Sequence, residues 1–210
     1  MSSQDNRLWL NMWRNRQTDG FHQLKVNKYL ARFWPRLELA KGMRVFVPLC
    51  GKSLDMIWLA SQGCEVIGVE LSPIAVEAFF KENHLQPVRR RMGSFTLWQH
   101  GRISILCGDY FALTKADLGH IDTVYDRAAL TALPEAARKL YVAHLQRIIS
   151  IMTNVFLLTI EDEAAEQIDD ELVSLYAGEF DIRLEFMEEG EESEEKIRSE
   201  YKVYRLVSRE

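Results

Sequence analysis

Short apolar runs alternate along this chain with longer segments in which apolar residues recur at helical spacing. The short runs predict strands at residues 44–47, 66–69, 95–98, 102–107, 123–125, 155–160, 182–187 and 202–207. The longer segments predict helices from residue 53 onward and over residues 73–82, 134–150 and 168–177. Such alternation is typical of a parallel sheet with helices on both faces. We therefore expect an α/β, Rossmann-like single domain over residues 1–210. Its seven-stranded sheet would be mostly parallel, with one antiparallel strand from a C-terminal β-hairpin.

Aromatic side chains are dense in residues 1–36, which precede an α/β core of residues 37–210. Trp9 and Trp13 stand four residues apart and would share one face of a helix that ends before Gly20. A second helix is expected from Val26 to Trp34, with Pro35 ending it. Two interpretations remain open. This segment covers an open sheet edge, or it closes over a planar ligand.

The first predicted strand runs into Pro48 and Gly51, and a helical pattern begins at Ser53, where Ser53 or Asp55 can cap the first turn. A strand followed by a glycine-bearing turn and a helix start is where α/β proteins bind nucleotide-like ligands. Many such turns are only structural connections. The glycine fingerprint of nicotinamide dehydrogenases is missing here, which disfavours that class of enzyme.

Polar residues stand at the carboxyl ends of three further predicted strands. Glu70 would accept the two hydroxyls of a ribose, or else cap the following helix. Asp109 and Tyr110 would hold an adenine by a hydrogen bond and by stacking, or else serve as a turn residue and a core residue. Asp126 and Arg127 are adjacent opposite charges followed by small residues, a pattern that indicates a site. Because the carboxyl ends of parallel strands meet at one edge of a sheet, these groups predict one binding site.

The charge is unevenly distributed along the chain. The net charge is −5, but residues 1–160 carry +7 and residues 161–210 carry −12. The acidic final part argues against a nucleic-acid partner. The basic cluster Arg89–Arg91 is isolated, and we interpret it as an exposed loop.

No apolar run is long enough to cross a bilayer, and the polar N-terminus does not resemble a signal peptide. We therefore expect a cytoplasmic protein with no membrane partner. Cys50, Cys64 and Cys107 are scattered, which predicts buried free thiols rather than a disulfide or a metal site. We expect no metal cofactor.

A series of motifs follows in order between residues 9 and 160. They are Trp9-x-x-x-Trp13, Gly20–Gln23, Val26–Leu30, Phe33–Pro35, Val47–Asp55, Gly68–Ser72, Ala75–Phe80, Cys107–Phe111 and Tyr125–Leu130. Together they resemble the thiopurine S-methyltransferase family in its bacterial form. The most specific segments are Pro-Leu-Cys-Gly-Lys-Ser and Asp-Arg-Ala-Ala-Leu.

The resemblance implies a class I methyltransferase fold, S-adenosyl-L-methionine as cofactor and S-adenosyl-L-homocysteine as product. By matching position it implies cofactor contacts from Trp13, Leu49, Gly51, Glu70, Asp109, Tyr110 and Arg127. It also implies that Phe21 and His22 lie over the methyl acceptor. Arg127 would be catalytic as well, because a nearby cation lowers the pKa of a thiol acceptor.

Two departures from the family pattern affect the site. The segment between Trp13 and Phe21 is one residue longer than usual, so Trp9 remains an alternative to Trp13 as the cofactor contact. After the strand at 155–160, the acidic sequence Thr159–Glu166 replaces a Tyr-Asp pair and a Pro-Pro-Phe segment of the family. Carboxylates in the wall of the acceptor pocket would disfavour anionic acceptors.

The leading hypothesis is therefore methyl transfer from S-adenosylmethionine to a thiopurine-like thiol or a related soft nucleophile. The alternatives are a methyltransferase acting on selenium or tellurium compounds, and a protein that binds the cofactor without thiopurine turnover. We expect a monomer whose partner is a small-molecule thiol or chalcogen acceptor.

Overall fold

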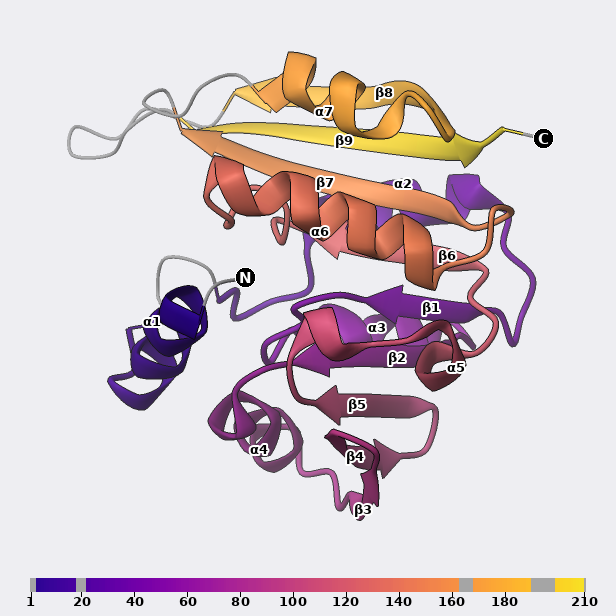
Figure 1. Cartoon of the computed structure of the whole chain (residues 1–210). Helices are drawn as coiled ribbons and strands as arrows, with labels where there is room; N and C mark the ends of the chain where they lie inside the picture. Colours follow the sequence, from indigo (N-terminus) through magenta and orange to yellow (C-terminus); the bar gives the residue numbers. More distant parts are fainter. Residues whose placement is uncertain (1–2, 18–21, 163–167, 190–198, 210) are drawn as a thin grey trace. The chain divides into compact units, whose positions relative to one another are not determined.

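The computed structural model describes residues 3–17, 22–162, 168–189 and 199–209. Their contacts divide the chain into two compact units, Met1–Gly119 and His120–Glu210. Each unit has its own strands and helices, which Figure 1 labels.

In the first unit, the part of the chain that the structure describes forms five strands in the order β3-β4-β5-β2-β1. They are β1 (Arg44–Val47), β2 (Glu65–Glu70), β3 (Val88–Met92), β4 (Phe95–His100) and β5 (Ile103–Cys107). β1, β2 and β5 run parallel, whereas β4 and β3 extend the sheet as antiparallel strands. Because the three parallel strands end at the same edge, the residues that follow them come together there (Figure 1).

Helices of the first unit connect and cover these strands. They are α1 (Ser3–Arg14), α2 (Lys28–Phe33), α3 (Asp55–Ser61), α4 (Pro73–Glu82) and α5 (Lys115–Leu118), with 3₁₀ turns η1 (Trp34–Leu37) and η2 (Tyr110–Ala112). α3 and α4 both contact β2 and β5. α4 has the predicted limits, because the Ser72 hydroxyl accepts a hydrogen bond from the Ala75 N–H and Pro73 occupies the first turn.

The interpretation of Arg89–Arg91 as a loop is wrong. These residues form β3, which pairs with β4. The side chains of β3 are exposed from Val88 to Arg91, so no alternation of apolar residues marks the strand in the sequence. Charged side chains on such a strand oppose pairing with another chain at the sheet edge.

The second helix of the N-terminal segment is shorter than predicted. Asn27 caps α2, since its Oδ1 accepts hydrogen bonds from the N–H groups of Tyr29 (2.9 Å) and Leu30 (3.2 Å). α2 ends before Pro35 as expected, but the chain continues into η1 with Pro35 in its first turn. Proline is tolerated there because the first N–H groups of a helix have no partner in it.

The described residues of the second unit form four strands in the order β6-β7-β9-β8 and two helices. They are β6 (Thr123–Arg127), β7 (Asn154–Asp162), β8 (Phe180–Glu189) and β9 (Ser199–Ser208), with α6 (Glu135–Ile148) and α7 (Ile168–Tyr176). β6 and β7 are parallel, and β9 pairs antiparallel with both β7 and β8. The C-terminal hairpin therefore adds an antiparallel strand as predicted. The described residues form nine strands in one sheet, whereas the sequence predicted eight strand segments and a seven-stranded sheet.

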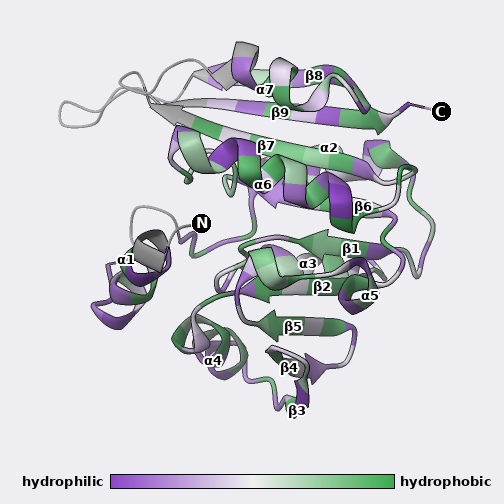
Figure 2. Ribbon diagram, in the orientation of Figure 1, coloured by the Kyte–Doolittle hydropathy of each residue, from purple (hydrophilic) through white to green (hydrophobic). Residues whose placement is uncertain are grey.

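Both units have apolar interiors. Fully buried side chains include Val45, Phe46, Val69, Phe79 and Ile105 in the first unit and Val124, Tyr125, Tyr141, Leu157 and Leu206 in the second. Figure 2 shows apolar residues concentrated along the strands, with apolar and hydrophilic residues alternating along α6. Among the described helices, none has the length and apolar character needed to span a membrane.

Candidate functional site

The turn after β1 is bonded to the end of β2. The Cys50 N–H donates to the Val69 carbonyl at 3.0 Å, and the Gly51 N–H donates to Glu70 Oε2 at 2.9 Å. Leu49 and Gly51 both have left-handed backbone conformations, with φ of 46° and 53°. This conformation favours glycine, and it turns the chain from β1 toward α3.

The Glu70 carboxylate lies at the centre of this edge. Its side chain is buried, and its Oε1 accepts a hydrogen bond from the Ser72 N–H at 2.7 Å. Burial raises the pKa of Glu70 from 4.5 to about 7, although hydrogen bonds from the N–H groups of Ser72 and Gly51 oppose this rise. Each carboxylate oxygen can accept more than one hydrogen bond, so Glu70 can still accept two O–H donors. The cap of α4 is Ser72, not Glu70.

Asp109 and Tyr110 follow β5 at the same edge. The Gly108 N–H donates to the Glu70 carbonyl at 2.9 Å, which places this segment beside β2. Asp109 Oδ1 accepts from the Phe111 N–H at 3.0 Å, so Asp109 is a turn residue as well as a candidate ligand. Tyr110 is almost fully buried, and its ring packs edge to face against Phe111. The Tyr110 ring is therefore held in a fixed position by packing in the interior of the first unit.

α1 contacts this edge at two points. The Asn6 side-chain amide donates to Asp109 Oδ2 at 3.0 Å. A Cβ at Gly51 would lie 3.2 Å from Cζ2 of Trp13, so the indole of Trp13 packs directly on this glycine. Trp13 is buried, whereas Trp9 is half-buried. Sequence reasoning missed the Asn6 contact, because nothing in the local pattern links residues 103 positions apart.

A second part of the N-terminal segment is fixed to α3. The Asn27 N–H donates to Asp55 Oδ1 at 2.8 Å, and both side chains are buried. The Ser53 hydroxyl accepts from the Asp55 N–H at 3.2 Å, but α3 begins at Asp55, two residues later than predicted, and its N-cap is Leu54, which makes no side-chain cap hydrogen bond. His22 is half-buried, and Phe21 lies outside the described residues.

The second unit contains Asp126 and Arg127 at the end of β6. Asp126 is fully buried and accepts hydrogen bonds from the Tyr141 hydroxyl at 2.7 Å and the Ala129 N–H at 2.9 Å. Burial raises the pKa of Asp126 from 3.8 to about 6, and the Tyr141 hydrogen bond opposes this rise. Ala128 has a φ of 60°, and its N–H donates to the Leu158 carbonyl. Asp126 therefore shapes the turn that follows Arg127, whose own side chain is half-buried.

All three cysteines are free thiols, as predicted, but only Cys50 and Cys64 are buried, whereas Cys107 is half-buried. Burial raises the pKa of Cys50 well above its ordinary value and that of Cys107 to about 11, and the charge of Glu70 adds to both rises. Both groups are therefore neutral at pH 7. In the part of the chain that the structure describes, no three His, Cys, Asp or Glu residues gather as a metal site would require.

Three contacts within the first unit, Trp13 with Gly51, Gly51 with Glu70 and Gly108 with Glu70, bring its predicted cofactor residues together. These residues are Trp13, Leu49, Gly51, Glu70, Asp109 and Tyr110. Arg127 occupies the equivalent kind of position, the carboxyl end of a parallel strand, in the second unit.

Solved structures share this fold over nearly the whole chain. Magnesium protoporphyrin IX methyltransferase from Synechocystis matches with a TM-score of 0.70 and 14% identity, covering 98% of this chain and 97% of that one. A Burkholderia thailandensis 1,6-didemethyltoxoflavin N1-methyltransferase matches with a TM-score of 0.65 and 13% identity, covering 97% and 87%. The fold is therefore that of the class I S-adenosylmethionine-dependent methyltransferases, which confirms the predicted fold class.

Sequence comparison identifies the family. The family model described as thiopurine S-methyltransferase matches residues 4–206. A thiopurine S-methyltransferase of Stutzerimonas stutzeri is 56% identical over 220 residues, covering 100% of this chain and 93% of that protein. One from Nitrosospira multiformis is 48% identical over 183 residues, covering 84% and 83%. The chain belongs to the thiopurine S-methyltransferase family and is an S-adenosylmethionine-dependent methyltransferase.

Proposed function

We propose that this enzyme transfers the methyl group of S-adenosylmethionine to a thiol of the thiopurine type or to a related soft nucleophile. The observation that supports this most is the environment of Glu70. A buried carboxylate at the end of β2 is fixed by the N–H groups of Gly51 and Ser72, and it keeps acceptor capacity.

The cofactor would be held mainly by residues of the first unit. Glu70 would accept the two ribose hydroxyls, and Leu49 and Gly51 would present their backbone to the methionine part. Asp109 would accept a hydrogen bond from the adenine amine, beside the ring of Tyr110. Trp13 would close over the cofactor, and Arg127 would be a further cofactor contact, as its motif implies.

The bound sulfonium supplies an already activated methyl group, so the protein mainly aligns the acceptor and excludes water. Arg127 would stabilise the acceptor as its thiolate by lowering the thiol pKa. Asp126, bonded to Tyr141 and Ala129, would hold the turn beside Arg127 in place. Phe21 and His22 would lie over a flat acceptor.

Trp13→Ala should weaken S-adenosylmethionine binding several-fold, because the indole packs on Gly51 at the proposed site. Trp9→Ala is the matched control, since it removes the same side chain four residues earlier on the same helix. Calorimetric titration of both variants with S-adenosylmethionine decides whether Trp13 or Trp9 is the cofactor contact. If only Trp9→Ala weakens binding, Trp9 is the cofactor contact.

Arg127→Gln should lower kcat about tenfold with a thiol acceptor of pKa about 8.5, and much less with a strongly acidic thiol that is already ionised. Arg127→Lys keeps the charge and should retain most of the activity with both acceptors. Initial rates for the two acceptors provide the test. Equal losses with both thiols would rule out the proposed role in thiolate formation.

The acidic sequence that begins at Thr159 favours the alternative of a protein that binds the cofactor without thiopurine turnover, because it replaces the Pro-Pro-Phe segment of the family's acceptor pocket. Selenium or tellurium compounds are the other alternative, as soft nucleophiles that accept a methyl group. Residues 163–167 lie outside the described part of the chain. We further propose that the enzyme is a cytoplasmic monomer that acts on small molecules and has no nucleic-acid or membrane partner.

A further inference from the structure

The interior of the second unit contains a carboxylate that packing alone does not require. Asp126 on β6 and Tyr141 on α6 have no exposed surface, and the Tyr141 hydroxyl donates to Asp126 Oδ2 at 2.7 Å. Taking a carboxylate out of water costs free energy that an apolar residue of similar size would not cost. A buried carboxylate therefore points to a specific role, and the other contacts of Asp126 are with the turn that follows Arg127.

This turn contains a residue in a backbone conformation that side chains rarely adopt. Ala128 has a φ of 60°, in the left-handed region. Asp126 Oδ1 accepts a hydrogen bond from the Ala129 N–H at 2.9 Å, and the Ala128 N–H donates to the Leu158 carbonyl at 2.8 Å. Strained backbone of this kind persists only where surrounding contacts fix it, and it is common beside functional residues. The position of Arg127 at the end of β6 therefore depends on the bonds that Asp126 makes.

α6 carries the Tyr141 hydroxyl to this turn. The buried positions of α6 include Ala137, Tyr141, Leu145 and Ile148, which recur at helical spacing and form one stripe. Within the second unit, α6 lies along β6 and β7 (Figure 1), and Tyr141 reaches Asp126 from this stripe. A hydrogen bond to a carboxylate favours its charged form, so Tyr141 opposes the effect of burial, which raises the pKa of Asp126 to about 6.

Two further titratable side chains are close to this carboxylate. The charge of Arg127, the next residue of β6, favours the ionised form of Asp126. Tyr176 on α7 is fully buried, and its pKa is raised by burial and then by the charge of Asp126. The Tyr176 hydroxyl has no hydrogen-bond partner among the described residues. Tyr176 is therefore a second buried hydroxyl near Asp126 that lacks the bond made by Tyr141.

We propose that Tyr141 is a positioning residue for methyl transfer, which keeps Asp126 ionised so that the carboxylate holds the turn beside Arg127. Side chains alternate along a strand, so Asp126 and Arg127 point to opposite faces and the effect passes through the backbone. Protonation of Asp126 weakens its charge-assisted bond to the Ala129 N–H and loosens the turn. This inference rests on the proposed role of Arg127, and it adds an acid limit to the activity that Tyr141 sets.

Tyr141→Phe removes the hydroxyl and keeps the ring. Loss of one hydrogen bond to a charged group should move the titration of Asp126 upward by about one pH unit. With a thiol acceptor of pKa about 8.5, kcat relative to the unaltered enzyme should be about 0.9 at pH 8, about 0.5 at pH 7 and about 0.2 at pH 6. Ionisation of the acceptor affects both proteins equally, so this ratio reports the enzyme alone.

Tyr176→Phe is the matched control, because it makes the same change at a buried tyrosine that does not bond to Asp126. Its kcat ratio should stay near one at every pH. If Tyr141 has only a structural role, Tyr141→Phe changes kcat by the same factor at every pH at which circular dichroism shows it folded. That result, or the same pH dependence in both variants, would overturn the proposal.

A second measurement does not depend on turnover. The backbone N–H signal of Ala129 in assigned ¹H–¹⁵N spectra should titrate with a midpoint near pH 6 in the unaltered chain and in Tyr176→Phe. In Tyr141→Phe the midpoint should lie near pH 7, and an unchanged midpoint would also overturn the proposal. If Arg127→Gln leaves kcat unchanged, the proposed role of Arg127 fails. If Arg127→Gln lowers kcat but the Tyr141→Phe ratio does not vary with pH, only the inference about Tyr141 fails.

Discussion

Glu70→Ala should weaken the binding of S-adenosylmethionine by about 1.5–3 kcal/mol, a rise in Kd of roughly tenfold to more than a hundredfold. The substitution removes a carboxylate that would accept both ribose hydroxyls in charge-assisted hydrogen bonds. It also removes the acceptor for the N–H groups of Gly51 and Ser72, which fix the turn after β1. Isothermal titration calorimetry measures the change directly.

Because Glu70 also supports the turn, the ribose contact needs its own test. A double-mutant cycle tests this contact when one change removes the Glu70 side chain and the other removes a ribose hydroxyl from the ligand. S-adenosylhomocysteine that lacks the ribose 2′-hydroxyl should bind less tightly than the natural compound to the unaltered enzyme, but equally well to Glu70→Ala. If the missing hydroxyl costs the same affinity in both proteins, Glu70 does not contact the ribose, and its role is confined to the turn.

The free energy of unfolding should fall as the pH rises from about 4 to about 7. Burial raises the pKa of Glu70 from 4.5 to about 7 and that of Asp126 from 3.8 to about 6. Between these values the folded chain keeps protons that the unfolded chain has released, so raising the pH favours unfolding. Each shift contributes about 3 kcal/mol to the free energy of unfolding. This contribution is fully present below the pKa that the group has in the unfolded chain, and it is lost as the pH rises through the pKa that the group has in the folded chain.

Urea denaturation at a series of pH values measures this decline. Glu70→Gln and Asp126→Asn should each flatten it, whatever their effect on stability at a single pH. Glu77→Gln is the control, because it removes a carboxylate on the exposed side of α4. If the free energy of unfolding falls with pH as steeply in Glu70→Gln and in Asp126→Asn as in the unaltered chain, other titrating groups cause the decline.

Much of the fold could be predicted from local sequence. β1 and α4 have the predicted limits, because a buried apolar run and a Ser-Pro helix start are strong local signals. The other central strands agree to within a few residues, since parallel strands are buried on both faces and read as continuous apolar runs. Their carboxyl ends carry the candidate residues Glu70, Asp109 and Arg127.

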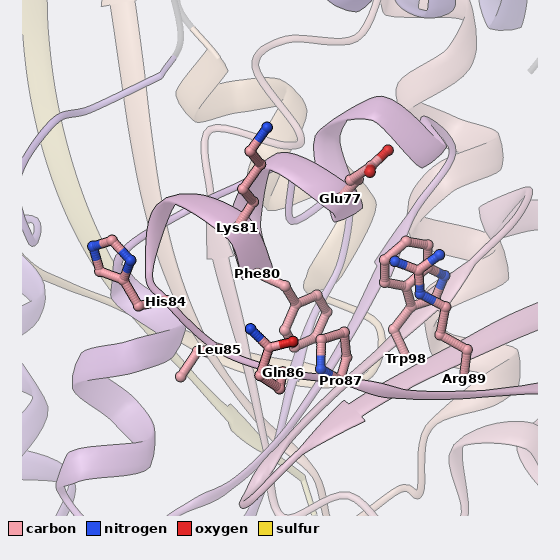
Figure 3. Close-up of a pocket in the computed structure, with 9 residues that line it drawn as sticks. All are labelled: Glu77, Phe80, Lys81, His84, Leu85, Gln86, Pro87, Arg89 and Trp98. Atoms are coloured by element: carbon pink, nitrogen blue, oxygen red, sulfur yellow. The ribbon is translucent and has the colours of Figure 1, made fainter.

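The remaining elements and contacts could not be predicted, because no local pattern of apolar and polar residues marks them in the sequence. β3 buries almost no side chain, so Arg89–Arg91 looked like a loop, and α5 is only four residues long. The contacts Asn6–Asp109 and Tyr141–Asp126 join residues that are distant in the sequence, and neither could be inferred from spacing. A pocket lined by Phe80, Arg89 and Trp98 (Figure 3) likewise exists only because α4 packs against the β3–β4 hairpin.

The measurement that most directly tests the central claim is a titration of the pure protein with S-adenosylmethionine, followed in the same tube by 6-mercaptopurine and chromatography for S-adenosylhomocysteine. Saturable binding and formation of S-adenosylhomocysteine that requires 6-mercaptopurine are the predicted results. Binding without turnover would contradict thiopurine transfer and direct the search to selenium and tellurium acceptors. The absence of any binding would contradict the assignment of the site around Glu70.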